Sequence, residues 1–157
     1  MNKEIIIGGG CFWGLQDLFR KRPGVVSTEV GYAGGSNERP TYENHPGHAE
    51  VLRVIYDPEV TSARDLFWYL FRIHDPTTKD RQGNDIGTSY RSVIFYKDEE
   101  ERKQAEEILA EVEESEKWSD PVTTTIEPLR NYFPAEEEHQ DYLQKNPHGY
   151  TCHFERW

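Results

Sequence analysis

The chain has 157 residues, and its 18 basic and 29 acidic side chains give a formal net charge of −11. This length is typical of one domain with its own hydrophobic core, so we expect residues 1–157 to form a single domain. The acidic balance argues against a nucleic-acid binder, because phosphate binding needs clustered Lys and Arg. The sequence has neither an apolar run near the roughly 18 residues of a membrane helix nor a signal-peptide pattern. We therefore expect a soluble, cytoplasmic monomer without membrane contact.

The negative charge is unevenly distributed along the chain. Residues 97–157 hold 7 basic and 17 acidic side chains, whereas residues 1–96 are almost neutral. Many of the acids fall within residues 98–116, where apolar residues recur at helical spacing. Such a segment is typical of a helix with one solvated face, so we expect the excess charge on that surface.

The first half of the chain alternates strand and helix patterns. Ile5-Ile6-Ile7 is a short apolar run followed by glycines, which favours a buried strand. From Phe12 onward, apolar residues recur at helical spacing until Pro23-Gly24 ends the pattern. Two further strands are predicted at residues 25–33 and 49–56, with a loop at 34–48 between them.

The second half continues with a longer loop and an irregular tail. Ser62 and Asp65 resemble a capping box, which predicts that a helix begins there. Residues 75–90 form a polar loop of a length that is often functional. Further strands are predicted at 93–96 and 123–126, and further helices at 98–116 and 135–145. The tail, from about residue 146 to 157, has no periodicity and is expected to be coil.

Strands and helices interleave around one core, and neither an internal repeat nor a linker is visible. The expected fold class is α+β. It would be a two-layer α/β sandwich with a mixed sheet, a ferredoxin-like core and a coil-rich C-terminal tail.

The chain has two cysteines, Cys11 and Cys152, which are too few for a disulfide framework. Cys11 falls where a strand is expected to end and a helix to begin. Unpaired backbone N–H groups and the helix dipole would favour its thiolate and lower its pKa, and the flanking glycines would allow close approach. The residues alone leave a buried, unreactive thiol as an alternative.

Gly10-Cys11-Phe12-Trp13-Gly14, the segment around the first cysteine, is similar to the active-site signature of the peptide methionine sulfoxide reductase A family. The other similar blocks occur in family order as far as the C-terminus: Gly31-Tyr32-Ala33-Gly34-Gly35, Pro40-Thr41-Tyr42, Gly47-His48-Ala49-Glu50, Tyr56-Asp57-Pro58, His74-Asp75-Pro76, Arg81-Gln82-Gly83-Asn84-Asp85, Tyr90-Arg91-Ser92 and His139-Gln140-Asp141-Tyr142-Leu143.

The resemblance implies thiol-dependent reduction of methionine S-sulfoxide, in proteins and as the free amino acid. It assigns attack on the sulfoxide sulfur to Cys11, which becomes a sulfenic acid, and protonation of the oxygen to Glu50. It assigns to Cys152 the formation of a disulfide with Cys11, which thioredoxin then reduces. No cofactor is implied beyond thioredoxin as the external reductant.

The position of Glu50 fits its implied role without fixing it. Side chains alternate along a strand, so Glu50 shares a face with Leu52 and Val54. Apolar neighbours favour the neutral form of a carboxyl group, which could then still hold a proton near neutral pH. Alternation leaves a solvent-facing Glu50 equally open, and the resemblance favours the acid.

The resemblance also implies a substrate-binding set. Tyr42 and Tyr90 would hydrogen-bond the sulfoxide oxygen, and Asp85 would order water and backbone at the site. Phe12 and Trp13 would form an apolar wall for the methyl group of the substrate. Taken alone, a Tyr is more often a packing residue with a satisfied hydroxyl.

Two alternative functions use the same residues. A thiol peroxidase would need the same pair of cysteines. A metal-binding module would combine Cys11, Cys152, His139, His148 and His153, but their spacing matches no zinc signature. We therefore expect no metal site.

Overall fold

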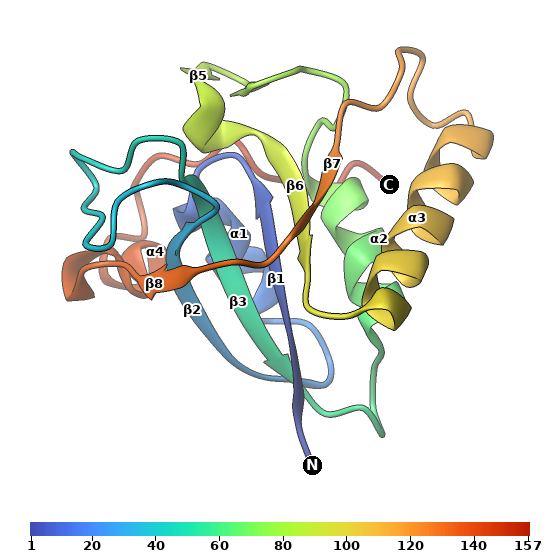
Figure 1. The fold of residues 1–157 in the computed structure, drawn as a ribbon, viewed down its shortest axis with the longest axis horizontal. Coiled ribbons are helices and arrows are strands. Elements are labelled where there is room, and N and C mark those ends of the chain that lie inside the picture. Colours follow the sequence, from blue (N-terminus) through green and yellow to red (C-terminus); the bar gives the residue numbers. More distant parts are fainter.

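The computed structural model describes residues 1–157 and shows a curled sheet with helices packed against it (Figure 1). The helices are α1 (Phe12–Phe19), α2 (Ala63–Ile73), α3 (Glu99–Glu114) and α4 (Tyr142–Lys145), with short 3-10 turns η1 (Thr88–Tyr90) and η2 (Glu137–His139). The strands are β1 (Lys3–Gly9), β2 (Val25–Ala33), β3 (Ala49–Tyr56), β4 (Arg81–Gln82), β5 (Asp85–Ile86), β6 (Ser92–Tyr96), β7 (Thr125–Pro128) and β8 (Tyr132–Pro134).

The central strands and two helices form the ferredoxin-like core that the sequence predicts. The main sheet has the order β7-β6-β1-β3-β2-β8, and β1 pairs antiparallel with both β3 and β6. The chain order β1-α1-β2-β3-α2-β6 is the split β-α-β arrangement of that fold. Because β7 pairs parallel with β6, the sheet is mixed. The α+β class is confirmed.

Both faces of the sheet are covered near the start of β3. One face carries the main core together with α1 and α2, and includes Leu52 and Val54. The other face carries a smaller cluster that includes Ala49 and Val51. Burial therefore does not alternate along β3 between Ala49 and Leu52, which explains why strand periodicity could not place Glu50.

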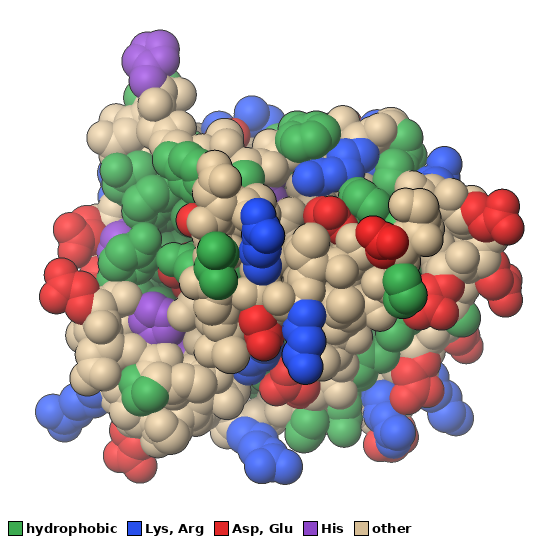
Figure 2. Space-filling model, turned by 90° about the horizontal axis from the view of Figure 1, so that it is seen from above, with side chains coloured by type: hydrophobic (Ala, Val, Ile, Leu, Met, Phe, Trp, Pro, Cys, Tyr) green, Lys and Arg blue, Asp and Glu red, His purple; other side chains and the backbone are tan.

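The cap predicted for α2 is present: the Ser62 hydroxyl accepts a hydrogen bond from the Asp65 N–H at 3.1 Å. In α3, Asp98 accepts from the Glu101 N–H at 2.8 Å. Figure 2 shows acidic side chains gathered toward the side of the molecule on which α3 lies. None of the helices combines the length and apolar character needed to cross a bilayer.

The helix predicted over residues 135–145 is wrong. The segment forms only η2 and α4, and Asp141 between them has a φ of 53°, outside the helical range. The Gln140 side chain explains the break: it accepts from the Val30 N–H at 3.0 Å and donates to the Val30 carbonyl at 2.9 Å. Pairing with the edge of β2 holds this part of the chain away from helical geometry.

Smaller differences occur in other segments. The strand predicted at 123–126 is found at Thr125–Pro128, and β8 was not predicted. The polar loop 75–90 contains the β4-β5 hairpin and η1. The strand predicted around Ile5-Ile6-Ile7 extends into the glycines and ends at Gly9.

The C-terminal tail is coil, as expected, and it lies against the sheet and α2. His153 donates from Nε2 to the Gly9 carbonyl at 2.6 Å. The Arg156 N–H donates to the Arg72 carbonyl at 2.9 Å. These two contacts bring the last residues back to the N-terminal part of the core.

Candidate active site

Cys11 lies where β1 leads into α1, as the sequence predicts. It is the N-cap residue of α1, and Gly10 before it has a φ of 97°, which favours glycine. The side chain is only 3% exposed, and the thiol is free. The turn thus holds a single thiol at the end of the helix, inside the protein.

The pKa of Cys11 is not lowered, contrary to the sequence-based expectation. Burial raises the pKa of the thiol well above its usual range, and Glu50 and Asp85 raise it further when they are ionised. The Trp13 backbone N–H opposes this rise by a smaller amount. The resting site therefore holds Cys11 as a thiol.

Glu50 lies beside this thiol with one carboxyl oxygen unpartnered. It is 1% exposed and sits opposite Tyr32 in the β2-β3 ladder. Its Oε1 accepts a hydrogen bond from the Phe12 N–H at 3.1 Å, whereas its Oε2 has no partner. Burial raises the pKa of Glu50 to about 8, so the group keeps its proton at neutral pH.

Tyr42, Tyr90 and Asp85 come from the two long loops that were predicted to be irregular. All three are partly exposed. Burial and then the charge of Glu50 raise the pKa of Tyr42 to about 12, and the same causes in the same order raise the pKa of Tyr90. Burial also raises the pKa of Asp85. Both phenols stay protonated and can donate hydrogen bonds beside Glu50.

Phe12 and Trp13 form an aromatic wall at the start of α1. Phe12 is fully buried. The Trp13 ring stacks on Tyr142 with centroids 3.8 Å apart, and lies parallel to Tyr42 at 6.0 Å. Its indole N–H donates to Nδ1 of His139 at 3.1 Å. The wall is therefore fixed in orientation by groups from α4 and η2.

Sequence reasoning missed the roles of Glu136, His139 and Tyr142. Glu136 accepts from the Tyr32 hydroxyl at 2.8 Å and from the Tyr42 N–H at 3.0 Å. His139 is buried and stacks on Tyr42 with centroids 4.5 Å apart. His139 and Tyr142 belong to a block already noted in the sequence, and that block was the available signal.

Cys152 is half-buried in the tail and is also a free thiol. Just before it, the Tyr150 hydroxyl donates to Oδ2 of Asp85 at 3.2 Å. The residue after Cys152, His153, hydrogen-bonds to the Gly9 carbonyl, so the fold brings this part of the tail back to the strand that leads into Cys11.

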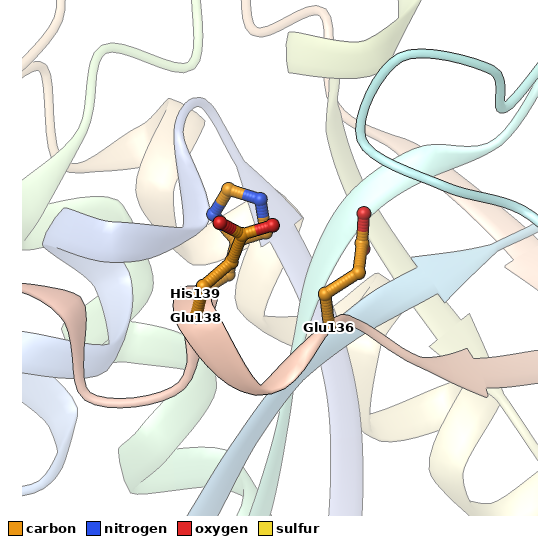
Figure 3. Close-up of side chains that lie close together, drawn as sticks. All are labelled: Glu136, Glu138 and His139. Atoms are coloured by element: carbon orange, nitrogen blue, oxygen red, sulfur yellow. The ribbon is translucent and has the colours of Figure 1, made fainter.

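The side chains that could hold a metal ion are not the set considered from the sequence. Glu136, Glu138 and His139 each place one ligand atom within 4.8 Å of the others. Figure 3 shows the Glu138 carboxylate over the His139 ring, with Glu136 to one side. Nδ1 of His139 and both oxygens of Glu136 already have hydrogen-bond partners. The geometry fits a positioning network for Trp13 and Tyr42 better than a metal centre.

A surface hollow lies away from the candidate site. Its volume is about 730 Å³, and its lining includes Glu4, Arg53, Lys97 and Glu101. None of the candidate site residues lines it. The volume of a surface hollow therefore does not identify the candidate active site. The buried Cys11 thiol and the unpartnered Glu50 oxygen are the features that point to it.

Comparisons with known proteins agree with this geometry. Residues 3–156 match the family model described as peptide methionine sulfoxide reductase. The chain is 59% identical to peptide methionine sulfoxide reductase MsrA of Nocardia farcinica over 154 residues, which is 98% of this chain and 91% of the relative.

Solved structures are similar over almost the whole chain. Mxr1 from Saccharomyces cerevisiae in reduced form is 40% identical with a TM-score of 0.92, covering 99% of this chain and 93% of Mxr1. Mxr1 in complex with Trx2 is 32% identical with a TM-score of 0.67, covering 99% and 91%. The chain thus belongs to the peptide methionine sulfoxide reductase family and is an oxidoreductase.

Proposed function

We propose that this enzyme reduces the S epimer of methionine sulfoxide, in proteins and as the free amino acid, through Cys11, Glu50 and Cys152. The observation that carries the proposal is the pairing of a buried thiol with a buried carboxyl group whose Oε2 has no partner. An unpartnered acid of this kind is poised to donate its proton to an incoming oxygen atom.

In the first step, the Cys11 sulfur attacks the sulfur of the sulfoxide, and Glu50 donates its proton to the sulfoxide oxygen. The attack forms a bond between the two sulfur atoms, and the protonated oxygen then moves to the Cys11 sulfur as both the S–O bond of the substrate and this S–S bond break. Cys11 loses its own proton to Glu50, so the products are methionine and a Cys11 sulfenic acid. One thiol is oxidised by two electrons and one sulfoxide is reduced by two.

Tyr42 and Tyr90 assist by donating hydrogen bonds to the oxygen as negative charge develops on it. Their raised pKa values keep them in the donor form. Phe12 and Trp13 receive the methyl group, since aromatic rings make favourable contacts with sulfur and with positive charge developing near it. Asp85 orders the polar side of the site.

In the second step, Cys152 attacks the sulfenic acid, the Cys11 S–O bond breaks, and water leaves with the Cys152 proton. The resulting Cys11–Cys152 disulfide is then reduced by thioredoxin. The yeast relative Mxr1 has been solved in complex with Trx2, which supports a thioredoxin as the reductant. A cycle that regenerates free thiols belongs in a reducing compartment, and we assign the enzyme to the cytoplasm.

The proposal is tested by thiol counting during sulfoxide reduction. Reduced enzyme is mixed with excess methionine S-sulfoxide in the absence of reductant, and methionine and free thiols are measured together. We expect about one methionine per enzyme with loss of both thiols, and no methionine from the Cys11→Ser variant. Peroxide consumption that outpaces sulfoxide turnover would instead favour the thiol peroxidase alternative. Sulfoxide reduction by Cys11→Ser would disprove the assignment of the nucleophile.

A further inference from the structure

The glycines on either side of Cys11 lie under the C-terminal tail. A Cβ atom added to Gly14 would lie 2.2 Å from Nδ1 of His153 and 2.5 Å from Oγ1 of Thr151. A Cβ atom added to Gly10 would lie 3.2 Å from Nε2 of His153. Distances below 3.0 Å are incompatible with ordinary packing, so residue 14 must be glycine for the tail to occupy this position.

His153 is the group that fills this space. It is only 6% exposed, and its Nε2 donates to the Gly9 carbonyl at 2.6 Å across 144 positions of sequence. A carbonyl oxygen can only accept, so Nε2 carries the hydrogen, and Nδ1 of a neutral ring is an acceptor. The Cys152 sulfur lies 4.0 Å from that Nδ1.

The contacts of the tail on either side of Cys152 differ in burial. Upstream, Tyr150 and Thr151 are exposed, and the Tyr150 hydroxyl lies near both the partly exposed Asp85, to which it donates, and the Cys152 thiol. Downstream, His153 forms a buried hydrogen bond to the strand that leads directly into Cys11. Cys152 therefore lies between an exposed segment, Tyr150 and Thr151, and a buried, hydrogen-bonded residue, His153.

We propose that His153 is the positioning residue of the resolving step: by docking on Gly9 and Gly14 it presents Cys152 to the oxidised Cys11. The proposal rests on the two-cysteine cycle described above. In that step the Cys152 sulfur bonds to the Cys11 sulfur, the S–O bond breaks, and water leaves. His153 holds the attacking residue and takes no part in the transfer of oxygen from the substrate.

The test separates the two steps of the cycle. Reduced enzyme is mixed rapidly with excess methionine sulfoxide without reductant, and methionine, trapped sulfenic acid and free thiols are followed with time. For His153→Ala we expect methionine to form at the wild-type rate, while the disulfide forms at least tenfold more slowly and sulfenic acid accumulates. Gly14→Ala should also slow disulfide formation, because its Cβ atom displaces the same ring.

Two further variants give the test a rescue and a control. His153→Gln retains an N–H donor near the position of Nε2, so it should restore most of the rate of disulfide formation. His148→Ala removes an exposed histidine of the same tail and should leave both steps unchanged.

The outcomes distinguish this inference from the proposed cycle itself. Wild-type disulfide formation in His153→Ala overturns the positioning role. An equal loss of methionine formation and disulfide formation in His153→Ala also overturns it, because His153 would then support the whole site. Absence of methionine or of the disulfide in the wild-type enzyme would instead contradict the two-cysteine cycle.

Discussion

Glu50 is a carboxyl group that the surrounding structure keeps neutral. Its environment offers one backbone N–H, from Phe12, and no basic side chain contributes to its pKa. Burial is the largest influence and raises the pKa to about 8. Because no neighbouring cation stabilises the carboxylate, Glu50 can hold a proton at neutral pH, as the proposed donor role requires.

The raised pKa of Glu50 has a measurable effect on stability. Between about pH 4.5 and pH 8 the folded protein holds a proton on Glu50 that the unfolded chain has lost, so rising pH favours unfolding. Glu50→Gln removes this titration. Relative to Glu50→Gln, the free energy of unfolding of the wild type should fall by about 1.4 kcal/mol for each pH unit in this window. Denaturant unfolding at several pH values measures the difference.

The control for Glu50 is a carboxyl group of the same type on the surface. Glu137 has an exposed side chain, so the stability of Glu137→Gln should follow the wild type across the pH range. A constant difference between wild type and Glu50→Gln from pH 5 to pH 8 would show that Glu50 is ionised throughout. The proton-donor role would then have to be abandoned.

At the scale of elements, η2 and the residues next to it connect strand β2 to the loop over residues 34–48. Gln140 pairs with the backbone of β2, and Glu136 joins the Tyr32 hydroxyl on β2 to the Tyr42 N–H in the loop. The loop over residues 34–48 is thus tied to the sheet at the residue proposed to contact the sulfoxide oxygen. Tyr42 is thus held through its backbone N–H.

Glu136→Ala should weaken the site without removing any catalytic group. It leaves the Tyr42 N–H without its acceptor, and the loss of a hydrogen bond to a charged group costs about 1.5–3 kcal/mol. We expect kcat/KM for sulfoxide reduction to fall roughly tenfold, with the rate of alkylation of Cys11 unchanged. Steady-state kinetics with thioredoxin measures the first quantity, and reaction with iodoacetamide measures the second.

Two neighbouring substitutions control this prediction. Glu136→Gln keeps an acceptor for the Tyr42 N–H and a donor that can face the Tyr32 hydroxyl, so its kcat/KM should lie near the wild-type value. Glu137→Ala changes an adjacent, exposed side chain and should have no effect. Wild-type kcat/KM in Glu136→Ala would mean that this network does not position Tyr42.

The limits of prediction from sequence follow from the contacts of each segment. Helices and strands with a periodic apolar pattern, such as residues 25–33 and α2, were predicted correctly because local burial determines them. Residues 135–145 failed because Gln140 bonds to a strand 110 positions away. The lowered pKa expected for Cys11 failed because its burial and the nearby acids depend on tertiary structure.

At the scale of the molecule, the acidic surface and the candidate active site lie in different regions. The acidic α3 lies on the opposite side from α4, which packs beside Trp13 (Figure 1). The almost neutral first part of the chain supplies every site residue predicted from the sequence except Cys152. The C-terminal tail folds back onto β1 next to that residue, so the proposed cycle depends on contacts between the two ends of the chain.

The most direct test of the two-cysteine cycle is the turnover of Cys152→Ser with thioredoxin and excess methionine S-sulfoxide. The proposed nucleophile, Cys11, and the proposed acid, Glu50, are intact in this variant, so it should release about one methionine per enzyme and then stop with Cys11 as sulfenic acid. The wild-type enzyme should turn over many times under the same conditions. Repeated thioredoxin-driven turnover by Cys152→Ser would contradict the account.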